Sequence, residues 1–204
     1  YAIRSCDWSS DVCSSDLDTS NYFSIAINDL NRMENVLDDY LHFAKPVIGK
    51  SERISIGKVL HNCKKMLELF FPIHHIQIVD CIEPNVHIET DSHKLTQALV
   101  NILVNSVEAM PNGGVLSITA KMIGRQLEIV IEDTGVGMNE EQLARIGEPF
   151  YSMKEKGTGF GLMTTFQLIR MMSGEISVKS KVGVGTKFSI ILPETIISKD
   201  TLEP

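Results

Sequence analysis

The sequence predicts an α+β fold in which helices cover one face of a largely antiparallel sheet. Beyond residue 50, segments with apolar residues at helical spacing are separated by short segments with the composition of strands. Several of these strands follow one another directly across short turns, which favours antiparallel hairpins. Strands that alternated regularly with helices would instead indicate a parallel, Rossmann-like sheet, and that alternation does not occur.

The composition excludes several classes of function. The chain has 204 residues, enough for one domain with an extension or for two small domains, and a net charge of −7. It has no run rich in lysine and arginine, so we expect no nucleic-acid partner. No apolar stretch reaches the roughly 20 residues needed to cross a bilayer, and the first residues lack the apolar core of a signal peptide. We expect a cytoplasmic protein, whose intact parent could still carry a membrane anchor.

The four cysteines support neither a zinc site nor a disulfide framework. They stand at Cys6, Cys13, Cys63 and Cys81, without CxxC pairs and without paired histidines. We therefore expect reduced thiols, in keeping with a cytoplasmic setting.

Residues 1–20 differ in character from the rest of the chain. They contain the near-repeat "WSSDV" and "CSSDL", rich in serine and aspartate and without helical or strand periodicity. Such a composition favours turns and disorder. We expect a disordered tail, or one that is not native to the protein.

Residues 21–50 are expected to form one long helix and a linker. Apolar residues follow the 3-4 spacing of a helical seam, and Pro46 ends the helix. The seam consists of Phe23, Ala26, Leu30, Met33, Leu37, Tyr40 and Ala44. A lone helix with such a seam needs a partner, either the domain that follows or the helices of an intermolecular bundle. We favour the bundle.

The "GKS" at Gly49–Ser51 resembles the end of a phosphate-binding P-loop, but we reject that interpretation. Ala44 stands where the P-loop pattern requires its first glycine. The preceding segment is predicted to be a helix, whereas a P-loop follows a strand.

The remaining elements alternate between helical and strand periods. "SIGKVLHNCKKMLELF" is amphipathic, with apolar residues at Ile56, Val59, Leu60, Cys63, Met66, Leu67 and Phe70. "HIQIVD" and "VHIET" are expected strands. "DSHKLTQALVNILVNSVEAM" is a long helix capped by Asp91 or Ser92, before the turn "PNGG". "VLSITAKM" and "LEIVIED" form a hairpin, "GFGLMTTFQLIRMMSG" is a helix that Gly174 can terminate, and "EISVKS" pairs with "KFSIILP".

The long helix carries a polar stripe along one face. It consists of Lys94, Gln97, Asn101, Asn105 and Glu108, spaced 3, 4, 4 and 3 residues apart. Asparagine is a poor helix former, and amide oxygens are hard ligands suited to Mg²⁺. The stripe alone is equally compatible with a solvated helix face.

The stretch "EDTGVGM" places an acid at the end of a strand and glycines directly after it. Asp133 could accept a hydrogen bond from an exocyclic amine such as that of adenine, while Gly135 and Gly137 let the backbone turn and approach a ligand. Taken alone, "DTG" fits an ordinary β-turn equally well.

A second glycine cluster, "KGTGFGLM", directly precedes an apolar helix. Gly157, Gly159 and Gly161 would leave backbone amides and the positive end of the helix dipole free to meet phosphate. The polar segment before it, "NEEQLARIGEPFYSMKEK", is expected to be a loop that covers a ligand. Phe150 and Tyr151 would be its apolar anchor, and Lys154 could reach phosphate.

The order of these motifs resembles the ATP-binding domain shared by histidine kinases, gyrase, Hsp90 and MutL. The sequence is most similar to bacterial sensor histidine kinases of the sporulation-kinase type. "NILVNSVEAM" resembles their N box, "DTGVGM" the G1 box, "EPFYSMKEKGTGFGLM" the F and G2 boxes, and "SKVGVGTKFSIILP" the closing hairpin. The resemblance covers about residues 22–193. It implies a Bergerat-type two-layer α/β sandwich over residues 51–195, with residues 196–204 as a C-terminal tail.

The resemblance implies a role for individual residues. Asp133 corresponds to the acid that recognises adenine, Asn105 to the Mg²⁺ ligand, and Asn101 and Lys154 to residues near the phosphates. The remaining residues that it assigns to the ATP site are Gly135, Gly137, Phe150, Gly157, Thr158, Gly159, Gly161, Leu162 and Thr186.

One position favours a kinase over a hydrolase. In the hydrolytic relatives, a glutamate able to activate water as a general base stands one helical turn before the magnesium asparagine. This chain has Asn101 there, which cannot accept the proton. A histidine acceptor needs less help, because neutral imidazole is already a nucleophile. We therefore expect a protein-histidine kinase that uses ATP and Mg²⁺.

The acceptor histidine of the family lies in a motif resembling H-E-[IL]-R-N-P, and none of the six histidines here has those neighbours. We expect a kinase truncated after its acceptor, which binds ATP but does not phosphorylate itself. Its partners would be the acceptor helix of its own family, a response-regulator receiver domain, and a second copy through residues 22–45. Two alternatives remain: a protein-serine kinase of the anti-sigma type and a nucleotide-dependent binding module.

Overall fold

The computed structural model describes residues 50–68, 71, 75–149, 151–152 and 159–194. All of these residues belong to one compact unit. The expectations for residues 1–20, for the helix at 22–45 and for the tail at 196–204 lie outside the described residues. Within the described ranges, none of the helices combines the length and the apolar character that a membrane span requires.

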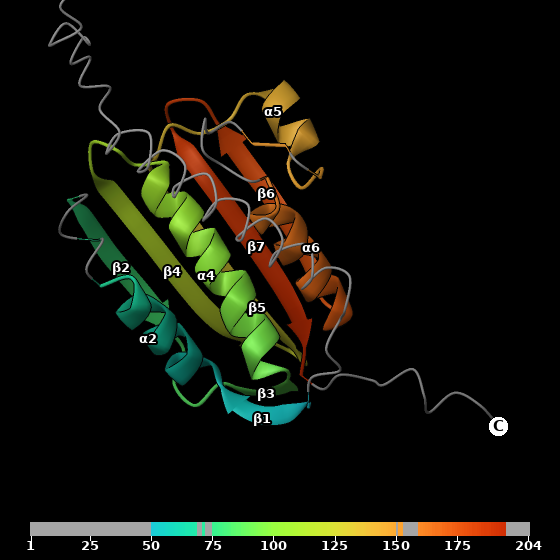
Figure 1. Ribbon diagram of the computed structural model, residues 1–204. Helices are drawn as coiled ribbons and strands as arrows, with labels where there is room; N and C mark the ends of the chain where they lie inside the picture. The colour runs from blue at the N-terminus through green and yellow to red at the C-terminus, as the bar shows by residue number, and fades with distance from the viewer. Residues whose placement is uncertain (1–49, 69–70, 72–74, 150, 153–158, 195–204) are drawn as a thin grey trace, which may run out of the picture. The chain divides into compact units, whose positions relative to one another are not determined.

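A five-stranded sheet with the order β2-β4-β5-β7-β6 organises the domain (Figure 1). β4 pairs with β5, β5 with β7 and β7 with β6 in antiparallel fashion, whereas β2 and β4 run parallel. The largely antiparallel sheet predicted from the sequence is thus confirmed, with one parallel pair at its edge. The strands are β2 (Ile76–Ile82), β4 (Gly114–Ile123), β5 (Gln126–Asp133), β6 (Glu175–Lys181) and β7 (Gly185–Pro193).

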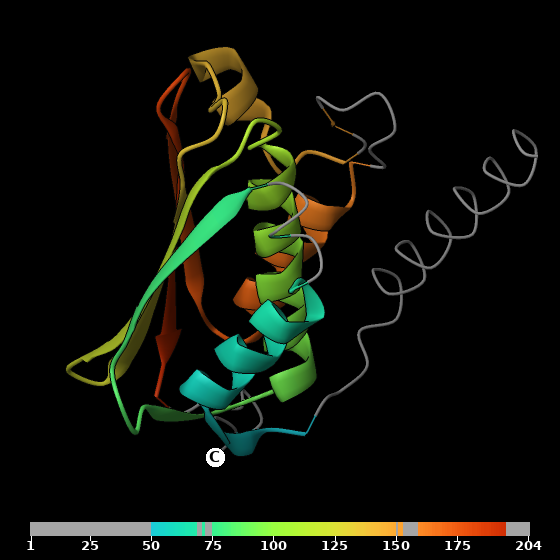
Figure 2. The same ribbon diagram turned by 90° about the vertical axis from the view of Figure 1, so that its left-hand side faces the viewer.

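The long helices lie on one face of this sheet, as Figure 2 shows. They are α2 (Ile56–Met66), α4 (Ser92–Glu108) and α6 (Gly161–Met171). A short antiparallel pair, β1 (Glu52–Ser55) with β3 (His87–Thr90), adjoins them, and α5 (Glu140–Arg145) contacts β6. The two-layer arrangement of the prediction is therefore present.

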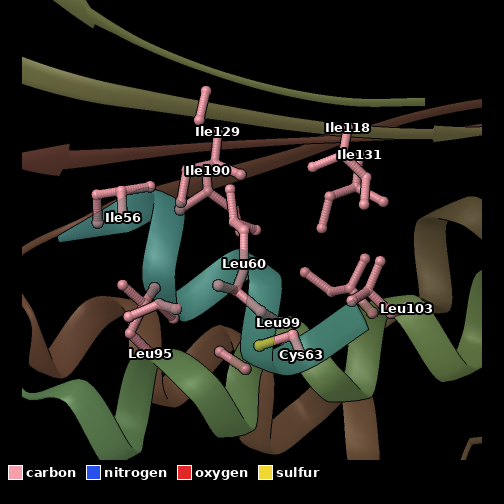
Figure 3. Close-up of a cluster of buried hydrophobic side chains, with 14 of the residues drawn as sticks. Ile56, Leu60, Cys63, Leu95, Leu99, Leu103, Ile118, Ile129, Ile131 and Ile190 are labelled. Atoms are coloured by element: carbon pink, nitrogen blue, oxygen red, sulfur yellow. The ribbon is translucent and has the colours of Figure 1, made fainter. Parts of the chain in front are cut away.

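The core fills the space between these helices and the sheet (Figure 3). Leu103 of α4 faces Ile118 of β4 and Ile131 of β5, and all three side chains are fully buried. The apolar face of α2 packs beside them, each buried aliphatic side chain contributing about 1.5–3 kcal/mol. One residue departs from the predicted pattern. Met66, the last residue of α2, is 62% exposed, whereas Leu67 directly after it is buried.

Local signals account for the start of α4. Asp91 precedes the helix in an extended conformation, and its Oδ1 accepts hydrogen bonds from the backbone N–H groups of His93 and Lys94, both at 3.1 Å. Two otherwise unpaired amides of the first turn are thereby satisfied. Of the two caps that the sequence allowed, Asp91 is the one used.

The end of α6 differs from the expected glycine cap. The residue in the left-handed conformation is Ser173, with φ of 57°, and its N–H donates to the carbonyl of Arg170. Gly174 follows, and its N–H donates to the carbonyl of Ile169 at 2.9 Å. A Cβ on Gly174 would collide with Cδ2 of Leu192 and lie 2.8 Å from the carbonyl oxygen of Ile191. Close packing against β7, rather than a positive φ, therefore requires this glycine.

We expect Gly174→Ala to lower the free energy of unfolding by about 1–3 kcal/mol, because the new methyl group has no room beside β7. Ser173→Gly is the matched control. It removes the cost of a left-handed serine while making the unfolded chain more flexible, so its net effect should be within about 1 kcal/mol. Urea denaturation of both variants measures the difference. Equal stability of the two variants would contradict the packing explanation.

Candidate functional site

A cavity of about 760 Å³ opens beside the C-terminal half of α4. Its described lining comes from α4, from the end of β5 and the turn after it, from the α5 region, from the start of α6 and from β7. These segments are distant in the sequence. Seven residues assigned to an ATP site from the sequence line this one cavity: Asn105, Asp133, Gly137, Gly159, Gly161, Leu162 and Thr186.

Asp133, the last residue of β5, is the buried acid of the cavity. It is 2% exposed, and its Oδ1 accepts two backbone hydrogen bonds, from Gly135 N–H at 2.9 Å and from Thr186 N–H at 3.1 Å. Its Oδ2 accepts no hydrogen bond from the part of the chain that the structure describes. The carboxylate is thus held by one oxygen, while the other remains available to a donor in the cavity.

Burial sets the protonation behaviour of Asp133. Desolvation of the carboxylate raises its pKa above the ordinary value for aspartate, and the negative charge of Glu132 acts in the same direction. Donation from the Gly135 and Thr186 amides opposes the rise, as does the nearby Ser106 hydroxyl, although that hydroxyl makes no hydrogen bond of normal geometry. Burial is the largest effect. A buried acid with a perturbed pKa in a cavity is typical of a functional site.

The turn after β5 fits closely against its surroundings. A Cβ on Gly135 would lie 2.5 Å from the carbonyl oxygen of Ala109, to which Val136 N–H donates at 2.9 Å. Gly137 has φ of 65°, and a Cβ there would collide with the carbonyl of Lys181. The glycines were expected to approach a ligand. The structure shows that they first allow the turn to approach α4 and β6, and that Gly137 lines the cavity whereas Gly135 does not.

β7 brings Thr186 next to the acid. Thr186 is the antiparallel partner of Asp133, is 5% exposed and lines the cavity. A Cβ on the preceding Gly185 would collide with the carbonyl of Asp133, so glycine is needed for this strand approach. Phe188, two residues further on the same face, also lines the cavity. The sequence analysis missed Phe188, although the alternation of β7 from Thr186 would have indicated it.

Only part of the polar stripe of α4 lines the cavity. Asn105 and Glu108 line the cavity, whereas Asn101 does not. The Asn101 side-chain amide instead donates to the backbone carbonyl of Gly161 at 3.2 Å, so it links α4 to the first residue of α6. The phosphate-contacting role assigned to Asn101 therefore stays a prediction.

The start of α6 forms another wall, through Gly159, Gly161 and Leu162. Gly159 has φ of 75°, and a Cβ on Gly161 would meet no atom of the described chain within 4 Å. Gly161 therefore leaves open space at the beginning of an 11-residue helix. The other predicted residues of this region, Phe150, Lys154, Gly157 and Thr158, lie outside the described residues.

The first part of the segment before α6 contains a short helix. It was predicted to be a loop, but it begins with α5, where Asn139 and Gln142 each bond the other's backbone N–H, at 2.8 and 2.9 Å, in a capping box. Gln142, Ile146 and Tyr151 line the cavity. The Asn-x-x-Gln spacing was a helix-start signal that the sequence analysis overlooked.

The raised pKa of Asp133 predicts a pH-dependent stability. The folded protein holds this proton more tightly than the unfolded chain, so the charged carboxylate costs stability as pH rises from about 3.9 through the raised value. Asp133→Asn removes that cost. We expect its free energy of unfolding, relative to the parent chain, to increase with pH across this window and then level off. Denaturant titrations at several pH values measure the difference, and a difference independent of pH would contradict the assignment.

Comparison with known proteins agrees with this geometry. A family model described as "Histidine kinase-, DNA gyrase B-, and HSP90-like ATPase" matches residues 90–196. Sporulation kinase E of Bacillus subtilis is 35% identical over 178 residues, which are 86% of this chain and 24% of that protein. Sporulation kinase A of the same organism is 36% identical over 176 residues, 85% of this chain and 29% of that protein. The chain thus spans less than a third of the length of either relative.

Solved structures of histidine kinases share the fold. Full-length ShkA in complex with AMPPNP superposes with a TM-score of 0.74 at 24% identity, over 87% of this chain and 39% of that one. The catalytic domain of ThkA in a nucleotide-free form gives 0.66 at 21% identity, over 72% and 97%. The predicted helix-covered sheet of histidine kinase catalytic domains is therefore confirmed. The chain belongs to the family of histidine kinase-, DNA gyrase B- and HSP90-like ATPases.

Proposed function

We propose that this chain is the ATP-binding catalytic part of a sensor histidine kinase, which transfers the γ-phosphate of ATP to a histidine in two-component signalling. The observation that carries the proposal is Asp133, held through Oδ1 by two main-chain amides with Oδ2 left for a ligand in the cavity. An adenine amine is a donor of the kind that this oxygen would accept. The named relatives, which are sporulation kinases, support the choice of a histidine kinase within the family.

Magnesium is part of the proposal. The cavity receives two carboxylates, from Glu108 and Asp133, so a bare triphosphate would meet unfavourable charge there. The Asn105 amide, which lines the same cavity, suits Mg²⁺, and the ion would share the nucleotide phosphates as ligands. Bound Mg²⁺ would supply neutralisation of phosphate charge, while the chain positions the nucleotide.

A kinase is favoured over a hydrolase by the residue at position 101. An amide cannot take a proton from water, and the Asn101 amide is engaged with the carbonyl of Gly161. A neutral histidine needs no such base. The catalytic role of this chain would then be to orient the γ-phosphate towards an acceptor.

The partners follow from the same proposal. The acceptor would be a family histidine on a bundle helix, and residues 22–45 would join the bundle of a homodimer. A receiver domain would take the phosphate onward; in support, ThkA, of the same fold, is known in complex with the response regulator protein TrrA (TM-score 0.73, 18% identity, 91% of this chain and 54% of that one). Use of ATP and of a receiver domain agrees with a cytoplasmic location.

Nucleotide binding tests the adenine assignment. In Asp133→Asn, the side-chain oxygen must stay with the Gly135 and Thr186 amides, so the new NH₂ group would face the cavity and oppose an adenine amine. Loss of a charge-assisted hydrogen bond is worth about 1.5–3 kcal/mol, so we expect ADP affinity to fall by about tenfold to a hundredfold. Calorimetric titration measures it. Glu132→Gln is the matched control, because Glu132 is the exposed neighbour on the same strand, and it should bind as the parent does.

An unchanged affinity in Asp133→Asn would remove the adenine assignment. A fall of the same size in Glu132→Gln would attribute the effect to the charge of the strand as a whole rather than to the buried oxygen.

Phosphoryl transfer tests the reaction class. We expect the chain, mixed with ATP, Mg²⁺ and a bundle hairpin that bears the acceptor histidine of a sporulation kinase, to label that hairpin with acid-labile phosphate. Incubated with labelled ATP alone, the chain should remain unlabelled. Label on serine would favour the anti-sigma type of kinase, and nucleotide binding without transfer would favour a binding module. Phosphohistidine on the isolated chain would refute the absence of an acceptor.

A further inference from the structure

Ser180 joins the two segments that frame Asp133. It lies near the end of β6, away from the lining of the cavity, and its Oγ has three polar neighbours. The N–H of Met138, in the turn after β5, donates to it at 2.8 Å. The carbonyl oxygen of Gly185 lies at 3.0 Å, and the hydroxyl of Thr186 at 2.9 Å. A backbone hydrogen bond, from Gly183 N–H to the Val136 carbonyl at 2.8 Å, also connects the turn after β5 to the β6–β7 hairpin.

The number of protons fixes the direction of these hydrogen bonds. A serine hydroxyl has one proton to donate and two lone pairs that accept. The Gly185 carbonyl can only accept, so the Ser180 proton is used there, and the Met138 N–H takes one lone pair. All three contacts are then hydrogen bonds only if Thr186 donates its proton to the second lone pair. The reverse direction, from Ser180 to Thr186, would leave one bond unmade, at a cost that buried polar groups normally avoid.

This arrangement determines what Thr186 offers to the cavity. With its proton held by Ser180, the Thr186 hydroxyl presents only lone pairs. The Asp133 Oδ2 is likewise an acceptor when ionised. Asp133 and Thr186, which line this corner of the cavity, therefore offer acceptors to a ligand, a pattern that suits an amino group and opposes a carbonyl oxygen.

We propose that Ser180 is a positioning residue for base selection: it holds Thr186 as an acceptor and keeps the turn at Met138 in place, so that the site prefers a 6-amino purine over a 6-oxo purine. This inference rests on the proposed function, because it assumes a purine nucleotide in the cavity. Ser180 acts through Thr186 and Met138 and would not touch the nucleotide itself.

Removal of the Ser180 hydroxyl should change the selectivity as well as the affinity. In Ser180→Ala, the Thr186 hydroxyl is free to turn and donate its proton into the cavity, where it would meet the 6-oxo group of inosine diphosphate favourably. We expect ADP affinity to fall about three- to tenfold, the effect of one hydrogen bond, and the ratio of ADP to IDP affinity to fall by a similar factor. Calorimetric titration of the 204-residue chain with ADP and with IDP measures both quantities.

Two further variants separate positioning from general damage. Ser180→Thr retains a hydroxyl and should restore the ratio towards that of the parent chain. Ser177→Ala removes an exposed hydroxyl from the opposite face of the same strand and should change neither quantity. Thermal unfolding of each variant verifies that it is folded. A Ser180→Ala variant in which ADP and IDP affinities fall equally, or not at all, overturns the proposal. A parent chain that binds neither nucleotide overturns the proposed function, and this inference with it.

Discussion

The site depends on two main-chain amides that hold one oxygen of Asp133. One amide comes from the turn directly after β5 and the other from β7, which pairs with β5 in antiparallel register. Neither approach is possible with a side chain in the way: a Cβ on Gly135 would press against the end of α4, and one on Gly185 would collide with the carbonyl of Asp133. A shift of the β5–β7 register by one residue would turn Thr186 to the other face of the sheet. The glycines, the register and the acid are therefore parts of one arrangement.

The arrangement also explains why a costly group is kept in the interior. Burial raises the pKa of Asp133, so its ionised form is less favourable here than in water. A third protein donor at Oδ2 would lower that cost, and the described chain supplies none, although the Ser106 hydroxyl is nearby. Leaving Oδ2 of Asp133 without a protein donor lowers the stability of the fold, but it keeps an acceptor available to a ligand in the cavity. Residues whose native environment lowers the stability of the fold in this way are commonly those that bind ligands.

Sequence alone could predict the type and order of the elements, because helical periodicity and strand pairs are local signals that tertiary packing here reinforces. The order of the motifs, rather than any one of them, also singled out Asp133, Asn105 and Thr186, which the structure brings to one cavity, while their roles stay predictions. Sequence alone could not predict that Asn101 bonds the Gly161 carbonyl, a contact over 60 residues that exists only once α4 and α6 have packed. Nor could it predict that Ser173 rather than Gly174 adopts the left-handed conformation, because the crowding of Gly174 against Leu192 arises only in the folded chain.

The described walls of the cavity are tied to the scaffold from outside. Asn101 holds the first residue of α6, and Gly183 and Ser180 hold the turn after β5, yet neither Asn101 nor Ser180 lines the cavity. These hydrogen bonds position the acid at the end of β5 and the glycines at the start of α6 before a ligand binds. Binding then requires less loss of conformational entropy in these segments. Among the described residues of the lining, Glu108 and Asp133 contribute carboxylates. Under the proposed function, a cation that accompanies the triphosphate would offset these charges, and the Asn105 amide would be one of its ligands without adding a further negative charge. The proposed preference for a nucleotide–metal complex over the free nucleotide therefore has its basis in the acids of the lining, whereas the ties outside the lining account for the position of its walls.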